Sequence, residues 1–256
     1  MKFSSIRKLS NVGKIDRELS LYFITFLLTL SQPLVCQELN TYLISYEASA
    51  GFATASATRS FSKITTNSYE LLNTIEVSVA AQSIMSMRER SRVTISDSRQ
   101  LIPLSYSMRQ TGFREKSENI EFDWIKSIAT ISSAERSQMV KIEGEIFDKL
   151  SHQLNIHSYI AQNADQISFN IIDESRIEKY QYSVLGNEDI KTPIGEFPSI
   201  KIERTLPKDT SRSVVFWLSS EWDGVLLKMS QMINSEITVT LEIQEGRVNG
   251  KSVIGK

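Results

Sequence analysis

The sequence is poor in the residues that build metal centres and disulfide frameworks. Its 256 residues include one cysteine, Cys36, and two histidines. A single cysteine can form neither a disulfide within one chain nor a thiolate metal cluster, and two histidines leave little material for a histidine-rich site. We therefore expect no typical zinc enzyme and predict neither a metal nor a cofactor.

The sequence also lacks an excess of charge of either sign. Lysine and arginine number 29 and the acids 30, so the net charge is −1. A nucleic-acid binder of this size would carry a strongly positive field, so nucleic acid is not an expected partner. With 41% hydrophobic and 23% charged residues, the composition is that of a globular chain with a packed core rather than of a disordered one.

Long hydrophobic runs are absent except near the N-terminus. Residues 1–17 carry Lys2, Arg7, Lys8, Lys14 and Arg17 against one acid, Asp16. The hydrophobic run Leu19–Leu30 follows. A membrane-spanning helix needs about 20 apolar residues, whereas the core of a signal peptide needs about 7–15. This length, the basic flank and Pro33 predict a cleaved secretory signal peptide over residues 1–36, and an uncleaved N-terminal anchor is the alternative.

The cleavage point stays open between two positions. Cleavage after Cys36 and cleavage after Ser31 both fit the preference for small residues imperfectly. A lipoprotein signal would place a small residue where Val35 stands, which leaves lipidation of Cys36 as a minor alternative. We predict export to a bacterial periplasm. The mature chain, 37–256, is expected to be a single β-rich domain without a transmembrane helix.

Beyond Gln37, hydrophobic residues recur mostly with a two-residue period, as half-buried strands require. We predict strands near 41–47, 69–79, 92–96, 101–108, 120–124, 125–131, 180–184, 200–203, 214–218 and 237–243. The stretch Arg176–Leu218 reads as a hairpin followed by a third strand, with a type I turn at Thr192–Gly195. The apolar strand 214–218 is expected to be covered on both faces, and the residues from Asn249 onward are expected to fray.

One segment, near 145–161, has helical periodicity instead. Its predicted apolar face consists of Phe147, Leu150, Leu154, His157 and Ala161. Asp148 is placed in the first turn, where a carboxylate suits the helix dipole. Large sheets must twist, curl or split. We therefore predict an all-β, mainly antiparallel fold, in which a strongly curved sheet or incomplete barrel holds one central helix near its concave side.

Several short motifs resemble one family of exported bacterial proteins. They are Tyr46-Glu47-Ala48, Ile102-Pro103-Leu104-Ser105-Tyr106, Phe122-Asp123-Trp124, Asp148-Lys149-Leu150-Ser151, Thr192-Pro193-Ile194-Gly195-Glu196-Phe197, Lys201-Ile202-Glu203-Arg204 and Phe216-Trp217-Leu218. In order and spacing, over about Tyr42 to Ile243, the chain is similar to the domain-of-unknown-function family 3108. The segment Ser219–Val225 departs from the family pattern, which tends to place a proline there. The resemblance implies an all-β envelope protein and no settled activity.

No catalytic constellation is predicted. Ser151 and His152 are adjacent on the expected helix and point about 100° apart, so the histidine cannot activate the serine. Asp148 and Ser151 are interpreted as residues that serve the helix N-terminus, and His157 as a core or boundary residue. Glu143 and Glu145 precede the helix, which suits its dipole better than general acid–base chemistry. We expect a protein that is not an enzyme.

Two further features allow binding. Met87–Arg92 is a basic run that phospholipid headgroups or phosphorylated glycans would suit, although an exposed strand or turn with Glu89 interspersed is the simpler interpretation. The aromatic residues Phe122, Trp124, Phe216, Trp217 and Trp222 either pack in the core or line an apolar pocket.

Three functional hypotheses follow. The first is a non-enzymatic periplasmic protein that holds a hydrophobic or envelope-derived ligand, such as a lipid, in a curved sheet. The second is a scaffold or assembly partner of envelope machinery that works through a sheet edge or an exposed patch. The third is a hydrolase of envelope polymers.

Overall fold

The computed structural model describes residues 39–50, 53–96, 100–174, 176–205, 213–232 and 238–256. The signal peptide, its cleavage points and Cys36 lie outside the described residues, as do part of the turn expected after residue 96 and the start of the strand expected at 237–243. Residues 40–256 form one compact unit.

The unit contains fifteen described strands and one described helix. In chain order they are β1 (Tyr42–Ala50), β2 (Ala53–Lys63), β3 (Ser68–Val79), β4 (Gln82–Ile95), β5 (Leu101–Gly112), β6 (Lys116–Asp123), β7 (Ile128–Ser133), β8 (Ser137–Lys141), α2 (Ser151–Ala161), β9 (Gln166–Asp173), β10 (Arg176–Thr192), β11 (Gly195–Thr205), β12 (Val214–Ser219), β13 (Leu226–Met232), β14 (Thr238–Val248) and β15 (Lys251–Ser252).

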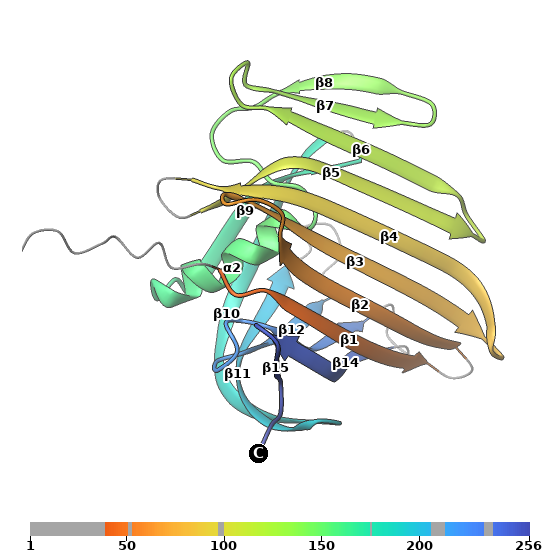
Figure 1. Ribbon diagram of the computed structural model, residues 1–256, viewed down its shortest axis with the longest axis vertical. Coiled ribbons are helices and arrows are strands. Elements are labelled where there is room, and N and C mark those ends of the chain that lie inside the picture. The colour runs from red at the N-terminus through yellow and green to blue at the C-terminus, as the bar shows by residue number, and fades with distance from the viewer. Residues whose placement is uncertain (1–38, 51–52, 97–99, 175, 206–212, 233–237) are drawn as a thin grey trace, which may run out of the picture. The chain divides into compact units, whose positions relative to one another are not determined.

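The strands form one antiparallel sheet that is not closed. Its order is β8-β7-β6-β5-β4-β3-β2-β1-β14-β13-β12-β11-β10-β9, with β15 added beside β14. The sheet therefore consists of two meanders, β1–β8 and β9–β14 (Figure 1). They join where β1 pairs with β14, from Tyr42↔Val248 to Ser49↔Thr240. The end strands β8 and β9 follow one another in the chain, and α2 is the connection between them.

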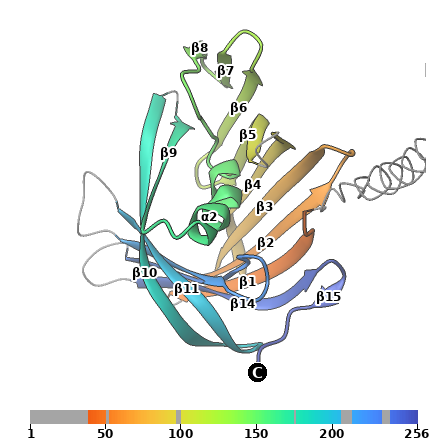
Figure 2. The same cartoon turned by 90° about the vertical axis from the view of Figure 1, so that its left-hand side faces the viewer.

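The sheet curves around α2, which lies on its concave side (Figure 2). The helix contacts β4, β5 and β9, strands that belong to both meanders. On the β9 side, the segment before the helix adds a short parallel bridge, in which Phe147 pairs with Ile171. The prediction of an all-β antiparallel fold, with a strongly curved open sheet and one helix, is confirmed for the residues that the structure describes.

The core has two parts. One lies where the meanders join and includes Ile44, Tyr46, Phe197, Leu227 and Ile243. The other surrounds the helix and includes Phe147, Phe169, Tyr182, Ile202 and Leu218. In both parts the buried residues alternate along their strands with exposed or half-buried ones, which is the period that the sequence predicted.

The predicted hairpin at Thr192–Gly195 is present. Thr192 pairs with Gly195 at the end of β10 and β11. The Thr192 hydroxyl donates to the Gly195 carbonyl at 2.8 Å and accepts the Ile194 N–H at 3.3 Å. Thr192 therefore shapes the turn. Gly195 has φ +123°, a conformation that side chains with a Cβ rarely adopt.

The expectation that the C-terminus frays is wrong. β15 pairs with β14, and the last two residues extend the β10–β11 hairpin. Gly255 N–H donates to the Ile194 carbonyl at 3.0 Å, and Lys256 exchanges two backbone hydrogen bonds with Glu196, at 2.9 and 3.1 Å. A Cβ on Gly195 would lie 2.6 Å from the Gly255 Cα, so this approach requires glycine.

The helix begins at Ser151 rather than at 145, and it buries a different face from the one predicted. Its buried side chains are Ser151, His152, Asn155 and Ile156. Leu154 and His157 are half-buried and Ala161 is exposed. Hydrophobic periodicity cannot locate this face, because three of its four buried residues are polar. Their side chains bond to Asp148 before the helix, to Tyr182 of β10 and to Leu101 of β5.

Other strand predictions were incomplete. β2, β8, β9 and β13 were not predicted, and the strand expected at 92–96 is part of the longer β4. In β5, Tyr106 and Met108 are buried, whereas Leu104 is 36% exposed. A register shift opposite Arg92 and Val93 leaves Leu104 as a bulge outside the pairing. The strand at 214–218 is central, but its residues 215–217 are only half-buried.

Candidate functional site

Asp148 anchors the start of α2 to the sheet. Its Oδ1 accepts the backbone N–H groups of Leu150 and Ser151, both at 2.8 Å, and its Oδ2 accepts the Ser91 hydroxyl of β4 at 2.7 Å. The Ser151 hydroxyl accepts the Asp148 N–H at 3.0 Å, a reciprocal pattern like that of a capping box. The interpretation that Asp148 and Ser151 serve the helix N-terminus is confirmed, although Asp148 precedes the first turn. Burial raises the pKa of Asp148 to about 6.

His152 is buried and links the helix to β10 by hydrogen bonding. Its Nδ1 lies 3.1 Å from the Asp148 carbonyl oxygen and its Nε2 lies 2.7 Å from the Tyr182 hydroxyl. Because a carbonyl can only accept, Nδ1 carries the proton and Nε2 accepts from Tyr182. Burial lowers the pKa of His152 to about 3, and the charges of Arg204 and Arg59 act in the same direction. The imidazole is therefore neutral and a weak general base.

Asn155 attaches the middle of the helix to β5. Its side-chain oxygen accepts the Leu101 N–H at 3.0 Å, and its amide donates to the Leu101 carbonyl at 2.8 Å. Leu101 has no β6 partner, because the β5–β6 pairing begins at Ser105. The asparagine thus supplies hydrogen-bond partners for the Leu101 N–H and C=O, which β6 does not pair.

A cavity of about 260 Å³ lies between α2 and the inner face of the sheet. The apolar residues of its wall include Ala57, Ile75, Phe216, Leu226, Met229 and Leu241. The polar residues of its wall include Arg59, Asn73, Glu89, Lys149, His152 and Arg204. Typical small-ligand pockets measure about 300–1,000 Å³ and combine an apolar wall with a few polar groups. At about 260 Å³ the cavity is slightly smaller than that range, and it has that composition.

Arg204 brings to this cavity a positive charge that no described carboxylate pairs with. Its guanidinium carbon lies 3.4 Å from the centroid of the Tyr180 ring. Its Nε is buried without a hydrogen-bond partner, and among the described residues no carboxylate forms an ion pair with it. Buried N–H donors normally have acceptors. The stacking holds the guanidinium plane in place while leaving a donor unused.

Arg59 is the second arginine of the cavity, and the two described side chains to which it donates are neutral. Its Nη1 donates to the Gln153 side-chain oxygen of α2 at 2.6 Å, and its Nε donates to the Tyr42 hydroxyl at 3.3 Å. The carboxylate in the cavity wall, Glu89, accepts instead from Tyr106 at 2.8 Å and from Asn73 at 3.1 Å.

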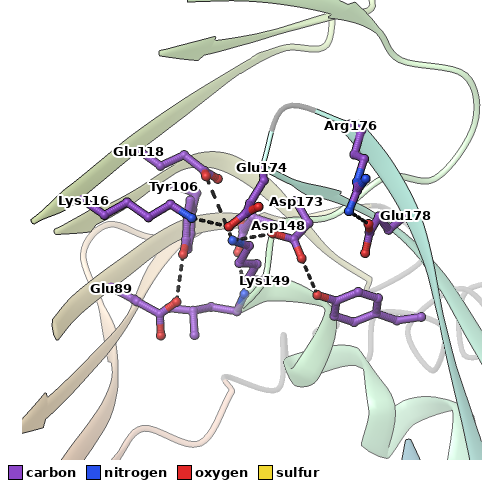
Figure 3. A network of polar contacts seen from close by, with 12 residues as sticks. Glu89, Tyr106, Lys116, Glu118, Asp148, Lys149, Asp173, Glu174, Arg176 and Glu178 are labelled. Carbon is purple, nitrogen blue, oxygen red and sulfur yellow. Dashed lines mark hydrogen bonds and ion pairs between the residues drawn. The ribbon is translucent and has the colours of Figure 1, made fainter. Parts of the chain in front are cut away.

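A charged network beside the cavity links the two meanders (Figure 3). Lys149, just before α2, lies 2.5 Å from Asp173 at the end of β9 and 4.0 Å from Glu118 of β6. Asp173 also accepts the Tyr180 hydroxyl at 2.8 Å. Burial raises the pKa of Glu118, whose Oε1 has no hydrogen-bond partner. One lysine thus links the helix start to strands of both meanders.

The candidate residues from the sequence do not converge. Glu143 pairs with Lys141 at the surface, at 3.0 Å, whereas Glu145 accepts the Tyr159 hydroxyl at 3.1 Å. His157 is a boundary residue, 3.6 Å from Asp223. Within the described ranges, no group of three histidine, cysteine, aspartate or glutamate residues is placed to hold a metal ion.

Of the five aromatic residues considered for a pocket, Phe216 lines the cavity. Trp217 lies on the opposite face of β12, between Lys201 and Lys228, which stand 5.2 and 5.7 Å from its ring. Phe122 stacks with Trp124, whose indole N–H donates to the Pro103 carbonyl at 2.7 Å. Trp222 packs against the core where the meanders join. The idea of a shared aromatic pocket is therefore wrong.

The cavity arginines were not identified from the sequence. A readable signal did exist, because Asn73 interrupts the inward-facing residues of β3, and Arg59 and Glu89 interrupt those of β2 and β4 in the same way. A polar residue at an inward position of a strand marks either a satisfied buried group or a lined cavity.

Within the described part of the chain, no helix is both long and apolar enough to cross a membrane.

Comparison with known proteins gives a family and a fold. The family described as "Protein of unknown function (DUF3108)" matches residues 41–242. This chain belongs to the DUF3108 family. No curated protein matches it. The Brucella abortus crystal structure described as a beta-barrel-like protein of domain of unknown function DUF1849 is 9% identical, with a TM-score of 0.57 over 84% of this chain and 100% of that one.

A second solved structure is more distant. It is a Bacteroides fragilis protein described as having a YmcC-like fold, 12% identical, with a TM-score of 0.35 over 81% of this chain and 95% of that one. At this TM-score the likeness carries no argument. The Brucella structure supports the DUF3108 chain's curved, barrel-like fold and nothing about its activity.

Proposed function

We propose that this DUF3108 protein is an exported, non-enzymatic binding protein whose cavity under α2 holds the anionic end of an envelope-derived amphiphile. The observation that carries the proposal is Arg204, whose side chain lines a cavity with apolar residues in its wall and whose Nε is buried without a hydrogen-bond partner. A guanidinium held by stacking is suited to a carboxylate or phosphate, because its donors match both oxygens of such groups.

The wall of the cavity supports an amphiphile rather than a fully polar ligand. Its lining includes Phe216, Leu226 and Leu241 as well as Arg59 and Arg204, so it offers contacts both to a hydrocarbon and to an anionic group. About 260 Å³ accommodates a small amphiphile or the end of a larger one. Neutral His152 and the hydrogen-bonded Glu89 provide no free base beside Arg204, which supports binding rather than turnover.

Native mass spectrometry of protein purified from the cell envelope tests the proposal. The wild-type chain is expected to carry an anionic amphiphile, and Ala57→Phe, which fills the cavity from β2, is expected to lose it. Thr58→Phe is the matched control, because Thr58 lies on the same strand and faces outward, so it should keep the ligand. A wild-type protein that is empty under conditions that retain lipid on known carriers would contradict the proposal.

Export through a cleaved signal peptide is part of the proposal and rests on the N-terminal sequence. The intact mass of protein from the periplasmic fraction is expected to correspond to a chain that begins at Gln32 or Gln37. Recovery of the full-length chain from membranes would favour an uncleaved anchor instead.

A further inference from the structure

The side chains of the basic run Met87–Arg92 lie alternately on the two faces of the sheet, because the run is part of β4. Residues of a strand alternate between faces, and Glu89 points into the cavity wall, where Tyr106 and Asn73 bind it. Arg88, Arg90 and Arg92 therefore share the outer face of β4 without the acid that separates them in sequence. The run is part of a strand, as the simpler interpretation expected, but Glu89 does not lie among the arginines on their face.

A hollow on that outer face collects three arginines. It measures about 330 Å³ and is lined by Arg88, Arg90, Arg109, Ser107, Ser117 and Asn119 together with Met108, so no carboxylate is part of its wall. Glu70 and Glu76 of β3 and Glu121 of β6 point to the same face, and Glu70 is paired with Arg90 and Arg92, at 3.3 and 3.4 Å.

Arg88 and Arg109 are directly opposite each other. They are paired residues in the β4–β5 register, where side chains of the same face lie about 5 Å apart and like charges repel. Among the described residues neither has an ion-pair partner. A cross-strand arginine pair without a counterion is a site that an anion would stabilise.

The strands that carry this pair end in exposed apolar tips. Phe113, in the turn after β5, is 95% exposed, and Val79 and Ile84, on either side of the β3–β4 turn, are 39% and 42% exposed. The Phe113 N–H donates to the Ile84 carbonyl at 3.0 Å, so the two tips are adjacent. Both turns lie at the right-hand end of the strands in Figure 1.

The spacing between tips and arginines fits the depth of a membrane interface. Arg109 precedes Phe113 by four residues, and Arg88 follows Ile84 by four, which is about 13 Å along a strand. Apolar groups of peripheral proteins insert about 5–10 Å below the headgroups, and aromatic side chains prefer this interface. Arginines behind the tips would then lie at the level of the phosphates.

We propose that the β3–β4 and β5–β6 tips dock on an anionic phospholipid surface, with Phe113 inserted and Arg88 and Arg109 on lipid phosphates. The juxtaposition of an exposed apolar tip with Arg88 and Arg109, which have no ion-pair partner among the described residues, favours a charged bilayer over a soluble anion, which would need no Phe113. This surface is distinct from the cavity, so it holds or fails independently of the ligand proposed above.

A fluorophore at the tip tests this in the mature chain from Gln37, because the hydrophobic run Leu19–Leu30 of an uncleaved signal peptide would itself enter vesicles. This chain contains no cysteine, so an environment-sensitive label is attached at Glu115→Cys beside Phe113. Ile125→Cys is the matched control, because Ile125 is 98% exposed in the turn between β6 and β7. Vesicles of phosphatidylcholine alone and of phosphatidylcholine with phosphatidylglycerol are compared, and inorganic phosphate is added without vesicles in a third arm.

We expect the label at 115, and not that at 125, to become brighter and bluer with the anionic vesicles. Arg88→Gln with Arg109→Gln is expected to weaken partitioning about tenfold or more, Phe113→Ser is expected to weaken it on neutral and anionic vesicles alike, and Arg136→Gln is expected to change nothing. No response at 115, an equal response with neutral vesicles that survives the double substitution, or a full response to inorganic phosphate alone would overturn the proposal.

Discussion

His152 should make the stability of the protein depend on pH in a calculable way. Its pKa falls from the ordinary value of about 6.5 to about 3 in the folded chain. Between these values the unfolded chain binds a proton that the folded chain does not, so the contribution is fully present above pH 6.5 and is lost as the pH falls. At pH 5 the loss is about 2 kcal/mol, because 1.5 pKa units at about 1.36 kcal/mol each separate pH 5 from 6.5.

The assay compares wild type with His152→Asn by urea unfolding at pH 7.5 and pH 5. The variant loses the hydrogen bond to Tyr182, which lowers its free energy of unfolding by the same amount at both pH values. It has no imidazole at this position, so it lacks the pH dependence that His152 gives the wild type. Its stability deficit is therefore expected to shrink by about 2 kcal/mol at pH 5. The raised pKa of Asp148 gives a slope of opposite sign in both proteins, and it cancels in the difference.

The measurement would refute this reasoning if the deficit were the same at both pH values within about 0.5 kcal/mol. That result would mean that His152 is protonated in the folded chain, or that water reaches the ring. Both Asp148 and His157 remain in the variant, so neither can produce the expected change in the difference.

Three further substitutions test the contacts that hold the fold. Gly195→Ala is expected to cost about 2–4 kcal/mol in thermal unfolding, because it adds a clash to a strained φ; Gly250→Ala, with φ +77° and open space around it, should cost less, about 1 kcal/mol. Asn155→Ala should cost about 2–4 kcal/mol in urea unfolding, because it leaves a buried N–H and C=O unpaired, and a loss no larger than that of Ser158→Ala would contradict its role. Lys149→Met should cost about 1.5–3 kcal/mol at pH 7, because it removes a charged contact to half-buried Asp173 and leaves buried Glu118 without its nearest lysine, and a neutral effect would mean that the network is solvated.

Much of the fold could be predicted because its strands alternate strongly. β1 shows Tyr42, Ile44 and Tyr46 on one face, and the Thr192–Gly195 turn has its own chemistry. β2 escaped because its inward residues include alanines and Arg59, which give little hydrophobic contrast with the outward serines and threonines. The C-terminus was misjudged because its two last residues depend on pairing with a distant hairpin, which local sequence cannot reveal.

The site was less predictable, for a physical reason. Arg59, Glu89 and Arg204 come from strands far apart in the chain, and only the curvature of the sheet brings them to one cavity. α2 was expected to bury an apolar face, but its buried residues are polar and bond to partners such as Leu101 and Tyr182. The alternation of residues along a strand can show that a charged residue such as Glu89 faces inward. It cannot show which residue of another strand that side chain will contact.

The most direct test of the central claim is calorimetric titration with two matched ligands, decanoate and decanol. The wild-type chain is expected to bind decanoate about tenfold or more tightly than decanol, since a hydrogen bond to a charged group contributes about 1.5–3 kcal/mol. In Arg204→Gln this preference should disappear while decanol binding stays unchanged. Equal affinity of the wild-type protein for both ligands, or binding of neither, would contradict the account.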